Sequence, residues 1–250
     1  MALLREKWLP RLRAARAAAL DVAFPRWCVS CGGLVETGEL QHLCETCLRE
    51  VAFVRPPHCA TCGWPFFGEV EGSRRCPHCA ELDPAFAAGR TGFLMRGAGR
   101  VFLHELKYHQ GLHLRTDLRG LIRRADSLRE FVRGAVLVPV PLHPSKLRER
   151  GFNQAQFVAE ALAAEGAAAG VADLLARTRD TPSQTRLDRA ARERNMRGAF
   201  EVKPGAMINV AARYVVVDDV ITTGATLNAC AQALHRAGAV NVDIATLGHG

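Results

Sequence analysis

The sequence contains no long uninterrupted run of apolar residues, although apolar residues make up 48% of its 250 positions. A membrane-spanning helix needs roughly 18 or more such residues in succession, so we expect no membrane span. Arg13, Arg16 and Asp21 interrupt the basic N-terminal segment, which excludes the apolar core of a secretory signal. We therefore expect a cytoplasmic protein that has room for one α/β domain and a smaller unit.

Aromatic residues are also scarce, at 6% of the chain. Residues 177–200 hold seven arginines, few large apolar residues and no aromatic residue before Phe200. Such a segment can bury little, so we expect it to be mobile and to act as a lid over an anionic ligand. The alternative is a nucleic-acid-binding arm that contacts phosphates. The lack of aromatic residues for base stacking weakens that alternative.

Charge is distributed unevenly along the chain. Residues 1–89 hold ten basic and ten acidic residues, so the whole net charge of +8 belongs to residues 90–250. A basic C-terminal part suits an anionic substrate and is also compatible with nucleic acid. The neutral charge of the N-terminal part argues against direct DNA binding there.

Eight of the nine cysteines occur as four CxxC pairs, and the arrangement repeats with offsets of 31 and 32 residues. In a reducing compartment such pairs are typical of thiolate metal ligands rather than of disulfides. A glycine follows the first pair and the third, where positive φ lets backbone amides face the thiolates. We expect a double zinc ribbon over residues 26–82, with one structural zinc ion on Cys28, Cys31, Cys44 and Cys47 and a second on Cys59, Cys62, Cys76 and Cys79.

An interleaved pairing of the cysteines is the alternative, because only 11 residues separate Cys47 from Cys59. In either arrangement a four-thiolate site is closed and has no open position for catalysis, so its role is structural or adhesive. The remaining cysteine, Cys230, is expected to be a small buried apolar side chain.

Residues 1–25 are predicted to form an amphipathic helix that ends before Pro25. Leu4, Trp8 and Leu12 fall on one side of it, together with alanines. This face contacts either a membrane surface, a partner or the rest of the protein. Its alanine-rich composition favours the last of these.

A buried strand, two carboxylates, a hydroxyl-rich turn and a helix follow one another near the C-terminus. Three valines at 215–217 predict a strand of a parallel sheet, and the helical spacing after Ala225 ends at Gly238. The amides and hydroxyls of the turn form a cradle for a phosphate, whereas Asp218 and Asp219 suit sugar hydroxyls or a metal ion. A ribose 5-phosphate satisfies both demands. The turn consists of Thr222, Thr223, Gly224, Ala225 and Thr226.

A second apolar strand is predicted at 135–141, and a basic loop follows it before a helix begins at Asn153 and Gln154. Lys146, Arg148 and Arg150 in this loop either neutralise a pyrophosphate or belong to a solvated turn. The loop follows a strand end, as the acidic pair does, which favours the first interpretation. Upstream we expect a linker at 80–92, a short strand at 93–95 and helices around 101–108 and 118–122. Lys107 and His109 are either surface charges or phosphate contacts.

The stretch from Val215 to Leu227 resembles the phosphoribosyl-pyrophosphate (PRPP) motif of type I phosphoribosyltransferases. The paired CxxC ribbons and several further segments resemble the ComF family, in the same order along the chain. These segments are Leu-Lys-Tyr at 106–108, Val-Pro-Val-Pro at 138–141, Arg-Gly-Phe-Asn-Gln at 150–154, Thr-Pro-Ser-Gln-Thr at 181–185 and Arg-Asn-Met-Arg-Gly-Ala-Phe at 194–200.

The resemblance implies an α/β fold with a parallel-sheet, type I phosphoribosyltransferase-like domain over residues 90–250, preceded by the small double zinc ribbon. It also implies binding of PRPP with Mg²⁺, and a link to competence, single-stranded DNA and proteins of the competence machinery. We expect Asp218 and Asp219 to be the catalytic pair of a phosphoribosyltransferase whose acceptor is unknown. The alternative is a PRPP-sensing or nucleic-acid adaptor protein that catalyses nothing.

Overall fold

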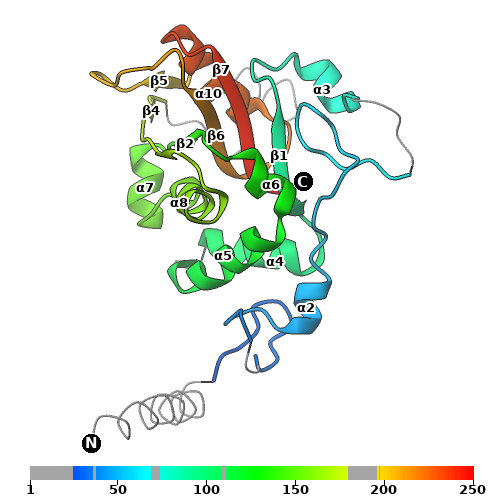
Figure 1. Cartoon of the computed structure of the whole chain (residues 1–250). Helices are drawn as coiled ribbons and strands as arrows, with labels where there is room; N and C mark the ends of the chain where they lie inside the picture. Colours follow the sequence, from blue (N-terminus) through cyan, green and yellow to red (C-terminus); the bar gives the residue numbers. More distant parts are fainter. Residues whose placement is uncertain (1–24, 36–37, 69–73, 109–110, 180–195, 197) are drawn as a thin grey trace, which may run out of the picture.

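The structure is a computed structural model that describes residues 25–35, 38–68, 74–108, 111–179, 196 and 198–250. The expected helix over residues 1–25 lies outside this part of the chain apart from its last residue, and so does most of the expected lid. A five-stranded parallel sheet with the order β1-β7-β6-β2-β3 forms the centre of the molecule (Figure 1). Its strands are β1 Gly89–Leu94, β2 Val136–Pro139, β3 Gly170–Val171, β6 Arg213–Ile221 and β7 Asn241–His249.

Helices cover both faces of the sheet. One core cluster joins helices α4 to α6 and α8 to Val215 and Val217, and a second joins α10 to Val216. Neighbouring residues of β6 thus point to opposite faces, which is why this central strand is apolar without interruption. The helices are α4 Gly97–Tyr108, α5 Arg115–Arg124, α6 Asp126–Phe131, α8 Gln154–Gly166 and α10 Ala225–Arg236, and a 3₁₀ turn, η1, spans Gly111–Leu114.

The cysteine-rich region contributes to both cores. Cys28, Cys47 and Leu40 belong to the first cluster, whereas the four cysteines from Cys59 onward belong to the second. The two halves of this region therefore pack against the layers on opposite faces of the sheet. They contain the short helices α2 Glu45–Arg49 and α3 Pro77–Leu82.

The segment between the two halves covers the edge strand β1. The amide of Val54 donates to the carbonyl of Gly92, and the amide of Leu94 donates to that of Ala52. Gly63, at φ +80°, lies so close that an added Cβ would meet the Cα of Arg90 at 2.9 Å. Edge strands with free backbone groups invite aggregation, so this contact protects the sheet as well as positioning the second half.

Three expectations about local structure need correction. The basic segment after β2 is a helix, α7 Pro144–Arg150, and not a loop. The side chain of His143 caps its start by accepting from the amide of Ser145, and Gly151, with φ 78°, caps its end. The last residues of the expected linker at 80–92 already belong to β1. The acidic pair lies within β6 rather than after it, because Val220 and Ile221 continue to pair with β7.

The expected lid starts and ends on a separate antiparallel pair of strands. These are β4 Leu175–Arg177 and β5 Phe200–Val202. The amide of Thr178 donates to the carbonyl of Ala199, so the two ends of the intervening segment lie side by side. Residues 180–195 and 197 are outside the described part, and the lid itself stays a prediction.

Candidate functional site

The acidic pair lies near the carboxyl end of the central strand β6. Asp219 is 8% exposed, and its backbone amide donates to Oδ1 of Asp218 over 2.9 Å. Burial raises the pKa of Asp218 well above its usual range, and the negative charge of Asp219 raises this pKa further. A cation bound beside the pair would favour the ionised form of Asp218.

Lys107 provides a positive charge beside the pair. Its Nζ lies 3.4 Å from Oδ2 of Asp219, and 32% of its side chain is exposed. The buried Gln154, at the start of α8, donates from its amide to the carbonyl of Lys107 over 3.1 Å and so ties the end of α4 in place. Lys107 thus stands between the acidic pair and solvent, where a ligand would approach.

The start of α8 also fixes the end of β2. Asn153 caps this helix by accepting from the amide of Ala155, and its side-chain amide donates to the carbonyl of Val140 over 3.0 Å. Asn153 and Gln154 act on backbone groups, so they are positioning residues.

The turn after β6 leads directly into α10. Gly224 occupies the N-cap position at φ 77°, a conformation in which a residue with a side chain would be strained. Glycine offers no side chain to cap the helix, so its first amides are not bonded by the cap residue. Thr222 is exposed, and Oγ1 of Thr223 accepts only a long 3.5 Å hydrogen bond from the amide of Ala225. The beginning of a 12-residue helix, with its positive dipole end, therefore faces the same sheet edge as the acidic pair.

The basic residues of α7 are placed by β2, which pairs with β6 through Pro139 and Val217. Lys146 forms an ion pair with Glu149 over 2.6 Å, and Arg150 donates to Oε1 of Gln154 over 3.2 Å. Arg148 is exposed. All three lie in the segment that follows this strand end, and a contact between them and a pyrophosphate stays a prediction.

The CxxC pairs gather into two clusters of four cysteines. Within each cluster all Sγ atoms lie within 4.8 Å of one another, and the sets are the tandem ones rather than the interleaved ones. Zn–S bonds of about 2.3 Å in a tetrahedron place sulfur atoms about 3.8 Å apart. Cys31 and Cys44 are 3.7 Å apart, and Cys62 and Cys76 are 3.6 Å apart, so both clusters fit structural zinc.

The glycines that follow the first and the third CxxC pair have the positive φ that the repeat predicts. Gly32 and Gly63 have φ angles of 70° and 80°. The amide of Cys44 donates to Sγ of Cys28 over 3.4 Å, and that of Cys76 donates to Sγ of Cys59 over 3.2 Å. Such hydrogen bonds favour thiolates and hence metal binding.

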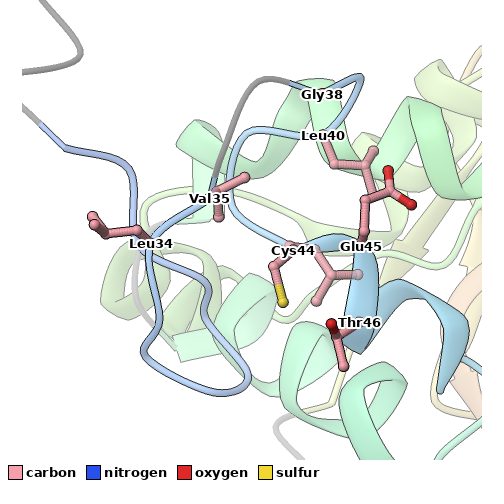
Figure 2. Close-up of a pocket in the computed structure, with 8 residues that line it drawn as sticks. Leu34, Val35, Gly38, Leu40, Cys44, Glu45 and Thr46 are labelled. Atoms are coloured by element: carbon pink, nitrogen blue, oxygen red, sulfur yellow. The ribbon is translucent and has the colours of Figure 1, made fainter.

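The two clusters differ in accessibility. All four cysteines of the second cluster are buried, whereas in the first Cys31 is exposed and Cys44 is half-buried. A cavity of about 350 Å³ opens beside Cys44, between Leu34 and Val35 on one side and the start of α2 on the other (Figure 2). The first metal centre is therefore the more open of the two.

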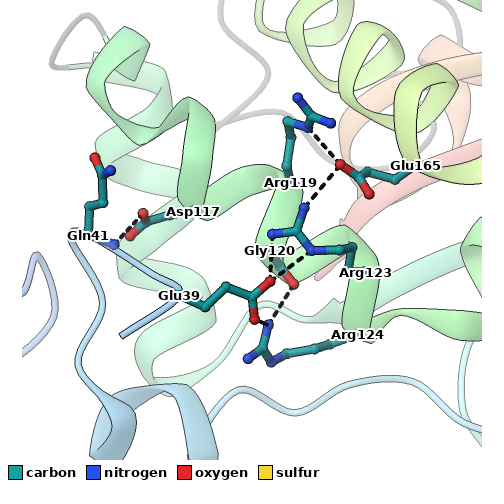
Figure 3. Close-up of polar contacts among 8 residues, drawn as sticks. All are labelled: Glu39, Gln41, Asp117, Arg119, Gly120, Arg123, Arg124 and Glu165. Atoms are coloured by element: carbon teal, nitrogen blue, oxygen red, sulfur yellow. Dashed lines mark hydrogen bonds and ion pairs between the residues drawn. The ribbon is translucent and has the colours of Figure 1, made fainter. Parts of the chain in front are cut away.

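A buried carboxylate holds the first half of the cysteine-rich region on α5. Asp117 is fully buried and accepts from the amides of Gln41 and His42 over 2.7 and 2.6 Å. Beside it, Glu39 forms ion pairs with Arg123 and Arg124 (Figure 3). These contacts join residues that lie 75 positions or more apart in the sequence, and no local pattern predicted them.

The second half contacts the carboxyl end of β7. The rings of Trp64 and His249 lie edge to face at 4.6 Å, and burial lowers the pKa of His249 to about 4. His249 pairs with Ile221, the last residue of β6. The second metal cluster is thus linked by packing to the sheet edge that carries the acidic pair.

Sequence reasoning missed Asp117 and His249, and it named Lys107 without settling its role. Asp117 and His249 carry no motif, and Lys107 was left between a surface role and a phosphate contact. Cys230 is fully buried in α10, as expected.

Comparison with known proteins supports this arrangement. The double zinc ribbon domain matches residues 19–80. The DNA utilization protein YhgH of Salmonella typhimurium is 28% identical over 81% of this chain and 88% of its own length. Competence protein F of Haemophilus influenzae is 23% identical over 87% of this chain and 94% of its own length. Competence protein ComFC of Streptococcus pneumoniae is 26% identical over 74% and 84%.

Within the described residues, no helix combines the length and apolar character needed to cross a bilayer. The zinc-ribbon match includes all eight cysteines of the two clusters, and the relatives cover most of the chain. The chain therefore has an N-terminal double zinc ribbon joined to a parallel α/β sheet, and the expected resemblance to the ComF family is confirmed, with YhgH proteins as further relatives.

Proposed function

We propose that the chain binds PRPP, or a related ribose phosphate with Mg²⁺, at the carboxyl edge of the sheet. The observation that carries this proposal is the arrangement at the end of β6. There, two neighbouring aspartates, one of them paired with Lys107, precede a threonine-rich turn at the start of a helix. A phosphate suits the turn and helix start, and hydroxyls or a cation suit the aspartates.

Each group has a distinct role in this proposal. Thr222, Thr223, Gly224, Ala225 and Thr226 hold the 5-phosphate. Asp218 and Asp219 orient the ribose hydroxyls or the Mg²⁺ ion. A cation fits this pair because burial, and after it the charge of Asp219, raises the pKa of Asp218, and a nearby cation would favour its ionised form. The basic residues of α7 attract the pyrophosphate.

As an enzyme, the protein would transfer the ribosyl phosphate to an acceptor. The bond between the anomeric carbon and pyrophosphate breaks, and a bond to the acceptor forms. Positive charge develops on the ribose ring in between, and the fixed carboxylates stabilise it. No residue of the chain needs to become a covalent nucleophile, and a bound Mg²⁺ would neutralise charge on the leaving group.

We also propose that this activity serves the handling of DNA. Support comes from the names of the relatives, which are a DNA utilization protein and competence proteins. The net charge of +8 agrees with an anionic partner. Proteins of the competence machinery are the partners that this proposal implies.

Titration calorimetry with PRPP and MgCl₂ tests the proposal. We expect wild-type protein to bind and the double variant Asp218→Asn, Asp219→Asn to lose binding while keeping its circular dichroism spectrum. Retained affinity in the double variant would refute the site. Release of pyrophosphate in the presence of candidate acceptors then separates an enzyme from a PRPP-sensing adaptor, which would bind without turnover.

A further inference from the structure

We propose that a groove between the first zinc ribbon and helices α5 and α6 binds the backbone of a single-stranded nucleic acid. The proposal rests on the DNA-handling part of the proposed function and gives it a surface. The groove shares no lining residue with the acidic pair or the threonine-rich turn.

The groove has a volume of about 790 Å³, within the range of ligand sites. Three parts of the chain line it, namely α2, the segment after α2, and the junction of α5 with α6. The lining residues that carry charge are Arg49, Arg55, Arg123 and Arg124, with Glu45 and Asp126 as the acidic members.

Ion pairs balance only part of the positive charge of the groove. Glu39 pairs with Arg123 and Arg124, and Glu165 pairs with Arg123 as well. Asp126 forms an ion pair with Arg129. Arg49 and Arg55 are exposed, and neither has an ion-pair partner among the residues that the structure describes. With Glu45 as the one unpaired acid in the lining, the groove keeps a positive excess that a phosphate chain would neutralise.

The floor of the groove is apolar. Leu48 and Val51 are buried, and the half-buried Phe53, whose ring lies edge to face on that of Phe93, is also a lining residue. Phosphates on arginines and bases against an apolar, partly aromatic floor are the combination that binds single strands without sequence preference. A duplex hides its bases, and an acidic peptide has no flat rings for this floor, so both fit it less well.

The two walls are held in fixed positions. Asp117 ties the ribbon to α5, and Glu39 joins it to the arginines at the end of that helix (Figure 3). A preformed groove loses little conformational entropy on binding. The ribbon region has no net charge, but its arginines line the groove together with those of α5, and in this way it can take part in DNA binding.

Fluorescence anisotropy with a labelled oligothymidine in a salt series tests this site. The variant carries Arg49→Glu and Arg55→Glu, both at exposed positions. We expect an affinity loss of about tenfold or more, and a salt slope smaller by about 1.4, since each single-strand phosphate contact contributes about 0.7. The matched control, Arg100→Glu with Arg133→Glu, makes the same charge change at exposed positions outside the groove and should lose much less.

Several results would overturn the groove. They are unchanged binding in the groove variant, an equal loss in the control, equal affinity for a duplex of the same length, and equal competition by polyglutamate. PRPP affinity separates this inference from the PRPP site, because the groove variant should keep it. Conversely, Asp218→Asn with Asp219→Asn should keep oligothymidine binding. Wild-type protein that binds PRPP but no oligothymidine refutes the groove and the DNA-handling proposal together, and leaves the PRPP site standing.

Discussion

Nζ of Lys107, at the end of α4, lies 3.4 Å from Oδ2 of Asp219 on β6. This ion pair joins the helix layer to the central strand at the place where the candidate ligand would enter. It also gives the pair of aspartates a neighbouring cation before any ligand arrives. The same ammonium is close enough to the sheet edge to meet an incoming phosphate.

Replacing Lys107 by methionine should weaken PRPP binding by about tenfold, or ~1.4 kcal/mol. Removal of the ammonium leaves the charge of Asp219 uncompensated and repels the anionic ligand. Calorimetry with PRPP and Mg²⁺ measures the effect. Lys203→Met is the matched control, because Lys203 pairs with Asp173 on the β4–β5 side. An equal loss in both variants would show that only net charge matters.

Replacing Asp218 by asparagine should stabilise the ligand-free protein at neutral pH. The folded state raises the pKa of Asp218, so folding favours its protonated form, and wild-type stability falls as pH rises from the unfolded pKa, about 3.9, through the folded one. Asparagine has no such cost and can still accept from the amide of residue 219.

Thermal unfolding between pH 4 and pH 8 checks this prediction. The melting temperature of Asp218→Asn should exceed that of wild type by a few degrees at pH 8, and the difference should shrink toward pH 4. Asp126→Asn, at an exposed carboxylate, should show no such trend. A variant that is less stable than wild type at pH 8 would contradict the conclusion that burial raises the pKa of Asp218.

Replacing Asp117 by alanine should lower the free energy of unfolding by about 2–4 kcal/mol, because the backbone amides of Gln41 and His42, which are half-buried, lose their charged acceptor. Chemical denaturation measures this loss. Limited proteolysis should show faster cleavage in residues 38–50, where the ribbon detaches from α5. Glu160→Ala removes an exposed partner of Arg115 instead and should change stability by less than about 1 kcal/mol. Unaltered proteolysis would mean that other contacts dock the ribbon.

Zinc should leave the two clusters at different rates. The purified protein is expected to hold two zinc ions, and a chelator should remove the one on the first cluster faster because Cys31 is exposed, whereas the second cluster is buried. A colorimetric chelator assay follows the release. Cys31→Ser should lose the fast phase and retain one ion, and Cys230→Ala should keep two. A single phase of two ions in wild type contradicts this difference.

Much of the fold was predictable from local pattern. The valines of β6, the helix after Ala225 and the helix at Asn153 are all where their periodicity and caps indicated. The misjudged segments are short ones. Charge made residues 144–150 resemble a loop, although Pro144 and the His143 cap start a helix there.

The candidate site was only partly predictable. The aspartates and the turn are contiguous in the sequence, so their chemistry could be read directly. Lys107 lies more than a hundred residues from Asp219, and its position depends on Gln154 holding its carbonyl. No local periodicity encodes a contact of that kind.

The amino-acid sequence by itself determined the four CxxC pairs, the apolar central strand and the threonine-rich turn, because each depends on residue types at short spacing, whereas only the structure chose the tandem cysteine sets. The tertiary structure alone decided that the two ribbons pack on opposite faces of the sheet, and that arginines from both halves of the chain line one groove. The physical reason is that burial and electrostatic attraction act through space, between groups that only the folded backbone brings together.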